Sequence, residues 1–229
     1  MDFEESVKYI SEYPRFKKIP SLDGIKALLS SLGNPENRIK TINIAGTNGK
    51  GSTAAMLSSV LSTAGYKTGR YISPFVLEFR ERMMINGKMI GRKRLAKIMS
   101  TVREHAEPLL EHGTVLNAFE LTTAAALLWF AEEECDFAVL EAGIGGRFDA
   151  TNAVPQPLLQ IITAVGLMLL EQHMAQAHHA HLAVAVGIAR EHAHVLIVAG
   201  YAVLQYQIVG VATRVDIAND LLELRAIGN

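Results

Sequence analysis

The sequence predicts an α/β protein built on a doubly wound, mostly parallel sheet. Over the first 155 residues, short apolar strands alternate with helical patterns and glycine-containing turns, which is the order that gives such a sheet. Hydrophobic residues make up 49% of the 229 residues and charged residues 20%. This composition excludes a disordered chain and is sufficient for a large core.

The expected elements follow one another with clear start and stop signals. A helix is predicted over residues 22–32, where apolar residues recur at helical spacing until Gly33-Asn34-Pro35 ends it. Asn86-Gly87 predicts the turn of a hairpin over residues 82–91, because such a turn needs positive φ angles. The other expected elements are strand 41–45, helix 52–64, strand 66–72, helices 92–111 and 119–133, and strands 137–140 and 159–163.

The last third of the chain differs in composition from the rest. All ten lysines lie at or before Lys97, and six of the eight histidines lie between His173 and His194. From about residue 157 onward the chain is rich in Ala, Val, Leu and His and has few turn signals, so no topology is predicted there. We expect residues 1–165 to form an α/β domain and residues 166–229 to be the degenerate remainder of that domain.

Charge and cysteine content exclude several classes of protein. Basic and acidic residues number 22 and 23, so the net charge gives no electrostatic footprint for nucleic acid, and a local basic patch remains the open alternative. The single cysteine, Cys135, excludes an internal disulfide framework and fits a reducing compartment. The apolar stretches at 161–170 and 195–204 are too short for a membrane span, which needs about 20 residues. With an acidic start that lacks a signal peptide, the chain is expected to be soluble and cytoplasmic.

A glycine-rich turn between a predicted strand and helix is the strongest candidate site. Glycines let backbone N–H groups face a phosphate, and a helix N-terminus adds partial positive charge. Lys50 would reach the terminal phosphates, and the hydroxyl of Ser52 or Thr53 would meet phosphate or Mg²⁺. The alternative is a tight turn with a solvated lysine, and the spacing differs from that of the common P-loop. The candidate residues are Gly46, Thr47, Asn48, Gly49, Lys50, Gly51, Ser52 and Thr53.

Two further polar residues are predicted at the carboxyl ends of strands, where ligands bind in such sheets. Glu141 ends a buried apolar strand, and a buried carboxylate is costly unless it meets a cation or hydrogen-bond donors. We therefore predict that Glu141 binds Mg²⁺ beside the phosphates, the alternative being a cap on the following glycine turn. Ser73 follows another strand and could offer a neutral oxygen to the same ion.

The two long motifs and several shorter segments resemble folylpolyglutamate synthases and dihydrofolate synthases, members of the Mur ligase superfamily. The resemblance extends over about residues 5–165. The segments that carry it are Ala27–Glu36, Ile42–Ser52 with Val60, Leu61 and Gly65, Ser73–Phe75, Phe79–Arg82, Phe119-Glu120 and Val139–Val154.

This resemblance implies a P-loop NTPase-like Mur ligase central domain and an ATP-dependent amide ligase. Such enzymes activate a folate or dihydropteroate carboxylate as an acyl phosphate, which the amine of L-glutamate attacks. The resemblance also implies a monomer with small-molecule substrates, and ATP and Mg²⁺ as cofactors. The roles it implies are ATP binding by the residues of the glycine-rich turn, catalysis by Lys50 and Glu141, Mg²⁺ binding by Ser73 and Glu141, and substrate binding by Arg82, Phe119 and Asp149.

The chain departs from the family pattern after residue 165. Met168 and Leu169 stand where the family has the Asp-His of a second metal site, and His192 stands where it has a lysine. Nothing in the sequence resembles the family's C-terminal domain. The histidines could instead form a Zn²⁺ or Ni²⁺ site, although their spacing matches no zinc motif. These histidines are His173, His178, His179, His181, His192 and His194.

Three functions remain open at this stage. The first is the ligase, with either dihydropteroate or a polyglutamyl folate as substrate. The second is a catalytically silent remnant that binds a nucleotide or a folate. The third is a small P-loop kinase, which the short glycine spacing disfavours.

Overall fold

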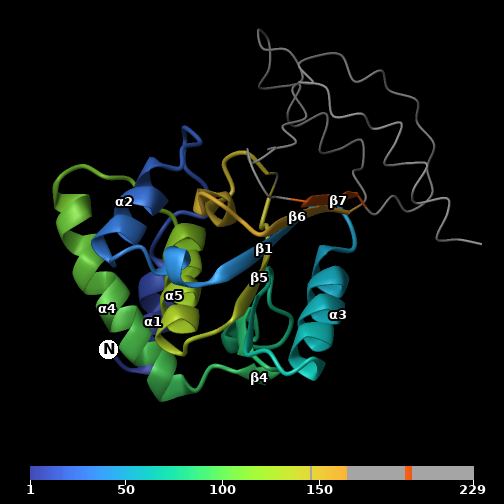
Figure 1. The fold of residues 1–229 in the computed structure, drawn as a ribbon. Helices are drawn as coiled ribbons and strands as arrows, with labels where there is room; N and C mark the ends of the chain where they lie inside the picture. Colours follow the sequence, from blue (N-terminus) through green and yellow to red (C-terminus); the bar gives the residue numbers. More distant parts are fainter. Residues whose placement is uncertain (145, 164–193, 198–229) are drawn as a thin grey trace, which may run out of the picture.

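A computed structural model describes residues 1–144, 146–163 and 194–197 of the chain (Figure 1). Within these residues a single sheet of seven strands runs in the order β4-β3-β2-β5-β1-β6-β7. Strands β2, β5, β1, β6 and β7 are parallel, and β3 and β4 form an antiparallel hairpin at one edge. The strands are β1 (Lys40–Ala45), β2 (Thr68–Tyr71), β3 (Met83–Ile85), β4 (Lys88–Met89), β5 (Phe137–Glu141), β6 (Leu159–Ile162) and β7 (His194–Ile197).

Helices cover both faces of the sheet in the described part of the chain (Figure 1). One face carries α1, α2, α4 and α5, and the other carries α3. The helices are α1 (Phe3–Ser11), α2 (Asp23–Ser31), α3 (Lys50–Thr63), α4 (Arg92–Glu111) and α5 (Ala118–Glu132), with short 3-10 turns η1 (Pro35–Arg38), η2 (Phe79–Arg82) and η3 (Ala150–Ala153). The doubly wound, mostly parallel α/β fold predicted from the sequence is therefore confirmed.

The hydrophobic clusters on the two faces of the sheet differ in size. In β1, Ile42 and Ile44 point toward α3 and join a small cluster with Ala54. On the other face, α5 is apolar around its whole circumference and lies buried between the sheet and the other helices. Phe130 of α5 is fully buried, and its ring packs against the backbone of Gly69 in β2, where a Cβ atom would approach it to 2.7 Å.

Most expected elements are present within two residues of the predicted bounds. The hairpin turns at Asn86-Gly87, both with positive φ, as predicted. Helix α1 was not predicted, although Asp2 and Glu5 form a reciprocal capping box at its start. Met168, Leu169 and His192 lie outside the described residues, as do the other clustered histidines apart from the backbone of His194. No helix in the described part of the chain is long and apolar enough to span a bilayer.

The parallel pairing determines where polar residues gather. Because β1, β2 and β5 run in the same direction, their carboxyl ends lie side by side, at what is called the carboxyl edge of the sheet. The segments that leave this edge are the turn before α3, the segment from Ile72 to Arg82 and the turn after Glu141. Together with the first turn of α3 and the last residue of β5, these three segments hold all of the predicted site residues except Phe119, which lies in α5.

Candidate functional site

The turn between β1 and α3, residues 46–49, is called the glycine loop below. Gly46 and Gly49 have φ angles of 134° and 85°, which side chains rarely tolerate. Gly49 is the N-cap of α3 and provides no side-chain cap, and the first turn of the helix contains no acidic residue. The N–H groups that begin α3 therefore form the kind of helix N-terminus that binds anions.

Lys50 lies across this loop. Its Nζ donates to the carbonyl oxygen of Gly46 at 2.8 Å and to that of Thr47 at 3.4 Å. The ammonium group is thus held directly over the backbone where a phosphate is predicted to bind. Ser52 is exposed in the first turn of α3, whereas Thr53 is half-buried.

Glu141 and Ser73 lie together at the ends of β5 and β2, as predicted. The backbone N–H of Ser73 donates to Oε2 of Glu141 at 3.2 Å. A Cβ atom on Gly51 would lie 3.4 Å from the same oxygen, so the start of α3 lies close to this carboxylate. The structure therefore brings the predicted metal ligands next to the glycine loop.

Glu141 is buried, with only 6% of the residue exposed. Burial raises its pKa above the ordinary value of 4.5, and the Ser73 N–H and the charges of Lys50 and Arg70 partly oppose that shift. A buried carboxylate that accepts a hydrogen bond from the Ser73 N–H is a suitable oxygen ligand for Mg²⁺, because the ion would supply the positive charge that stabilises a buried anion. The donor set therefore fits a magnesium ion.

The predicted substrate residues surround Tyr71, a residue that the sequence did not single out. The Phe119 ring lies 5.7 Å from the Tyr71 ring, and the Tyr71 hydroxyl hydrogen-bonds with Thr122 Oγ1 at 2.9 Å. Burial raises the pKa of Tyr71, with the charge of Arg82 lowering it and that of Asp149 raising it. Arg82, Phe119 and Asp149 are thus near one another in the fold.

Arg82 lies against two aromatic rings at the rim of this cluster. Its guanidinium carbon lies 5.2 Å from the centroid of Phe75 and 5.6 Å from that of Phe79. Its Nε is buried and has no hydrogen-bond partner. A planar cation between aromatic rings is suited to recognising a flat, polar ligand. Sequence reasoning missed Phe75 as a ring partner, although it follows Ser73-Pro74 directly.

Asp149 organises its own loop. Its Oδ2 accepts from the N–H groups of Gly143 and Ile144 at 2.8 and 3.0 Å. Its Oδ1 accepts from the N–H and the hydroxyl of Thr151 at 3.0 and 2.7 Å. Four donors occupy the acceptor capacity of one carboxylate. The structure thus places Asp149 beside the aromatic cluster and shows its present partners to be the loop itself.

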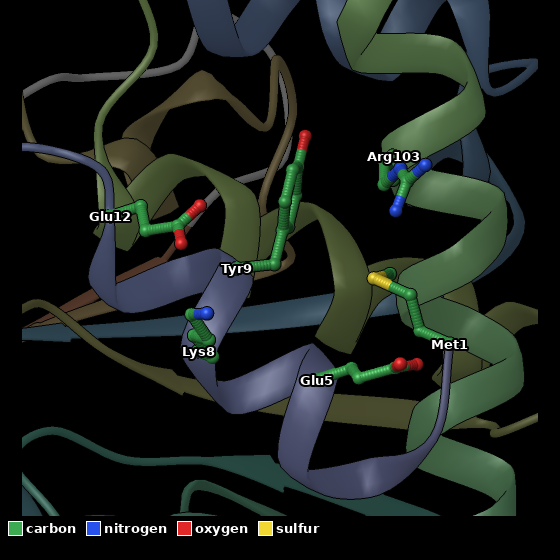
Figure 2. A pocket seen from close by; sticks show the side chains of 6 residues that line it. All are labelled: Met1, Glu5, Lys8, Tyr9, Glu12 and Arg103. Carbon is green, nitrogen blue, oxygen red and sulfur yellow. The ribbon is translucent and has the colours of Figure 1, made fainter.

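A separate groove of about 300 Å³ lies between α1 and α4 (Figure 2). Several of its side chains already have partners, since Glu5 caps α1, Arg103 pairs with Glu107 and the Tyr9 hydroxyl accepts from Tyr13. The groove contains none of the predicted site residues. Its lining consists of Met1, Glu5, Lys8, Tyr9, Glu12 and Arg103. Within the described residues, no group of three or more His, Cys, Asp or Glu side chains could hold a metal ion.

No family model matches the chain, but individual proteins do. It is 40% identical over 167 residues to a dihydrofolate synthase/folylpolyglutamate synthase of Bacillus subtilis, covering 72% of this chain and 38% of that protein. It is 38% identical over 169 residues to folylpolyglutamate synthase of Lacticaseibacillus casei, covering 73% and 39% of the two chains. The chain thus spans about two fifths of the length of these relatives.

Solved structures agree with the sequence relatives. Folylpolyglutamate synthase from Thermotoga maritima superposes with a TM-score of 0.69 at 42% identity, over 74% of this chain and 39% of that one. An FPGS complex with AMPPCP and folate gives a TM-score of 0.68 at 38% identity, over 71% and 40%. Over the aligned part, this chain is therefore similar to the N-terminal portion of the folylpolyglutamate and dihydrofolate synthases of the Mur ligase family.

Proposed function

We propose that this chain carries the ATP-binding portion of a ligase that joins L-glutamate to a carboxylate of folate or dihydropteroate through an acyl phosphate. One observation carries this proposal. Lys50 and the glycine loop lie next to the Ser73–Glu141 pair, at the carboxyl ends of the parallel strands. The names of the similar proteins, and the complex of one of them with AMPPCP and folate, support it.

In this proposal Lys50 and Glu141 are the catalytic residues. The ammonium group of Lys50 would leave the carbonyl oxygens of Gly46 and Thr47 and contact the terminal phosphates. The N–H groups at the start of α3, with the hydroxyls of Ser52 and Thr53, would bind the remaining phosphate oxygens. Stabilisation of charge on the transferring phosphoryl group is the main requirement of this chemistry.

Magnesium is proposed at the Ser73–Glu141 pair. The Glu141 carboxylate and the Ser73 hydroxyl would hold the ion, which supplies positive charge that neutralises the phosphates when bound. Lys50 and Arg70 already place positive charge near Glu141, which favours its ionised form. An ionised Glu141 is the form that a metal ion needs.

Phe119 and Arg82 are proposed to line the site of the folate or dihydropteroate ring. The Phe119 ring offers a flat apolar surface beside Tyr71, and Arg82 offers hydrogen-bond donors with an unsatisfied Nε. Asp149 is included because its loop brings Gly143 against Phe119, where a Cβ would lie 2.8 Å from the ring. These three residues would therefore shape one side of the substrate site.

We further propose that residues 1–165 form the ATP-binding Mur ligase-type unit and that residues 166–229 continue it. A cytoplasmic monomer that acts on small molecules, without nucleic acid or membrane partners, fits the near-zero net charge and the single cysteine. That cysteine is buried, and burial raises the pKa of its thiol to about 11. Cys135 is therefore an inert core residue.

The proposal is tested by measuring ADP release from Mg·ATP with folate or dihydropteroate, in the presence and absence of L-glutamate. Glutamate-dependent release is the result expected of a ligase. Phosphoryl transfer to a hydroxyl without glutamate would support the small kinase instead. Nucleotide binding without any turnover would support a silent binding remnant. Lys50→Ala serves as the control that removes the proposed phosphate contact.

A further inference from the structure

A buried ion pair lies beside the proposed substrate site and has no part in the function described so far. Lys17 Nζ donates to Glu120 Oε1 at 2.6 Å, and the two side chains are 7% and 4% exposed. The residues are 103 positions apart in the sequence. The other ion pairs of the described chain are far more exposed, such as Arg92–Glu4 at 59% and 70%.

The pair anchors residues 14–21, here called the strap, to the start of α5. The Ala118 N–H donates to the Pro14 carbonyl oxygen at 3.0 Å. Lys17 Nζ also donates to the Ser21 carbonyl oxygen at 3.3 Å. Gly24 of α2 packs closely against Lys17, since a Cβ atom added to this glycine would lie only 2.8 Å from Lys17 Nζ. The ammonium group thus sits where the strap, α2 and α5 converge.

The two carboxylate oxygens of Glu120 accept hydrogen bonds from different partners. Its Oε2 accepts from the N–H of Asn117 at 2.9 Å, and the side chain of Asn117 accepts from the N–H of Glu120 at 2.9 Å. This capping box defines the first turn of α5, while Oε1 is left for Lys17. The orientation of that turn is therefore coupled to the position of the strap.

A buried ion pair contributes orientation more reliably than stability, because desolvation offsets most of its attraction. The residue oriented here is Phe119, which precedes Glu120 in the same turn. Its ring is confined between Tyr71 and Gly143, so a small rotation of the turn would change the surface offered to a ligand. The described hydrogen bonds of this junction join the strap and the start of α5, and none of them involves a residue of the glycine loop.

We propose that Lys17 and Glu120 are positioning residues for the folate-type substrate. Their ion pair holds the first turn of α5 so that the Phe119 ring presents its face to the substrate ring. This inference rests on the proposed function, because it assumes that a folate or dihydropteroate ring binds beside Phe119. It concerns the acceptor substrate alone and leaves Mg·ATP binding independent of the pair.

The test is a calorimetric titration of the full chain with folate and, separately, with Mg·ATP. The main variant is the double substitution Lys17→Met with Glu120→Gln, which removes both charges and leaves an amide oxygen for the cap. We expect folate affinity to fall about tenfold to a hundredfold, as expected for a misplaced contact, and Mg·ATP affinity to stay within about twofold of wild type. Lys17→Arg, which can pair with the same carboxylate, should restore most of the folate affinity.

Arg92→Met is the matched control, because it removes an ion pair on the surface. It should leave both affinities unchanged. Unchanged folate affinity in the double variant would overturn the positioning role, even if the melting temperature fell. An equal loss of folate and Mg·ATP affinity would overturn it too, by showing a general structural effect. The wild-type chain is also titrated with dihydropteroate, and a chain that binds Mg·ATP but neither folate nor dihydropteroate would overturn both this inference and the proposed substrate.

Discussion

Two loops leave the same edge of the sheet and are stabilised in opposite ways. In the glycine loop after β1, a cation of the chain, Lys50, lies on backbone carbonyl oxygens and the N–H groups of a helix start have no side-chain cap. In the loop after β5, residues 142–149, an anion of the chain, Asp149, accepts from backbone N–H groups. The first loop lacks an anion of its own, whereas the second contains one.

This difference separates binding from stability. A helix N-terminus with no acidic residue in its first turn, beside a lysine that donates to neutral carbonyl oxygens, can bind the anion of a ligand, as the proposed ATP site requires. Backbone donors already paired with a buried carboxylate contribute to the folded state itself. Substitutions in the glycine loop should therefore affect nucleotide affinity, and substitutions in the Asp149 loop should affect stability.

The largest effect on stability is expected from Asp149→Ala. This change leaves the N–H groups of Gly143, Ile144 and Thr151 without their charged acceptor, so the free energy of unfolding should fall by about 3 kcal/mol or more. Urea denaturation measures this value. Lys50→Ala is the counterpart in the other loop and should change it by less than about 0.5 kcal/mol. Equal losses in the two variants would contradict the comparison.

An intermediate effect is expected from Gly143→Ala. The new Cβ would lie 2.8 Å from Phe119 Cζ, so the ring or the loop must move, at a cost of about 1–3 kcal/mol. Thermal denaturation and folate titration should both show the change, and Mg·ATP affinity should not. The matched variant is Gly49→Ala. Its new Cβ would contact no atom, but alanine would have to adopt the φ of +85°, which should lower the free energy of unfolding by about 1 kcal/mol. Gly49→Ala should weaken Mg·ATP binding and leave folate binding unchanged. If Gly143→Ala weakened Mg·ATP binding and Gly49→Ala weakened folate binding, the assignment of the two loops would be wrong.

The smallest change in stability is expected from Glu141→Gln, which should increase the free energy of unfolding at neutral pH. The pKa of Glu141 is raised by burial, so the folded state binds the proton more tightly than the unfolded state does. Wild type therefore loses stability relative to the variant as the pH rises from 4.5 through the folded-state pKa. Urea denaturation at several pH values measures this difference. A variant less stable than wild type at neutral pH would show that the carboxylate is structural.

The same substitution should reduce the Mg²⁺ dependence of nucleotide binding. In wild type, protons compete with Mg²⁺ for Glu141, so this dependence should weaken as the pH falls through the raised pKa. Nucleotide titrations at increasing Mg²⁺ concentrations test this point. An unchanged Mg²⁺ titration in Glu141→Gln would remove this residue from the proposed metal site.

Local sequence signals predicted the parallel core and the first loop well. Gly46 to Thr53 carries glycines, a lysine and hydroxyls in consecutive positions, so the turn was recognisable without any long-range contact. Glu141 was recognisable because an acidic residue ending an apolar strand requires a partner. Helix α1 was overlooked although its signal is local, because Asp2 and Glu5 were considered only as charges that exclude a signal peptide.

Contacts between distant segments could not be predicted where no motif or strand end indicated them. The Lys17–Glu120 pair joins residues 103 positions apart, and the local sequence around either residue does not predict its partner. The same holds for Tyr71, which became part of the site only through its packing against Phe119 and its hydrogen bond to Thr122. The choice of sheet face also depends on the complete packing, which places α3 opposite the other four helices of the described chain.

The most direct test of the central claim is a calorimetric titration with Mg·ATP of the 229-residue chain and of its Lys50→Ala variant. Lys50 lies over the glycine loop and is expected to transfer its hydrogen bonds from the Gly46 and Thr47 carbonyl oxygens to phosphate. Binding by wild type that is lost in a folded Lys50→Ala variant is the predicted result. Equal affinity of the two proteins, or no binding by either, would contradict a working phosphate site.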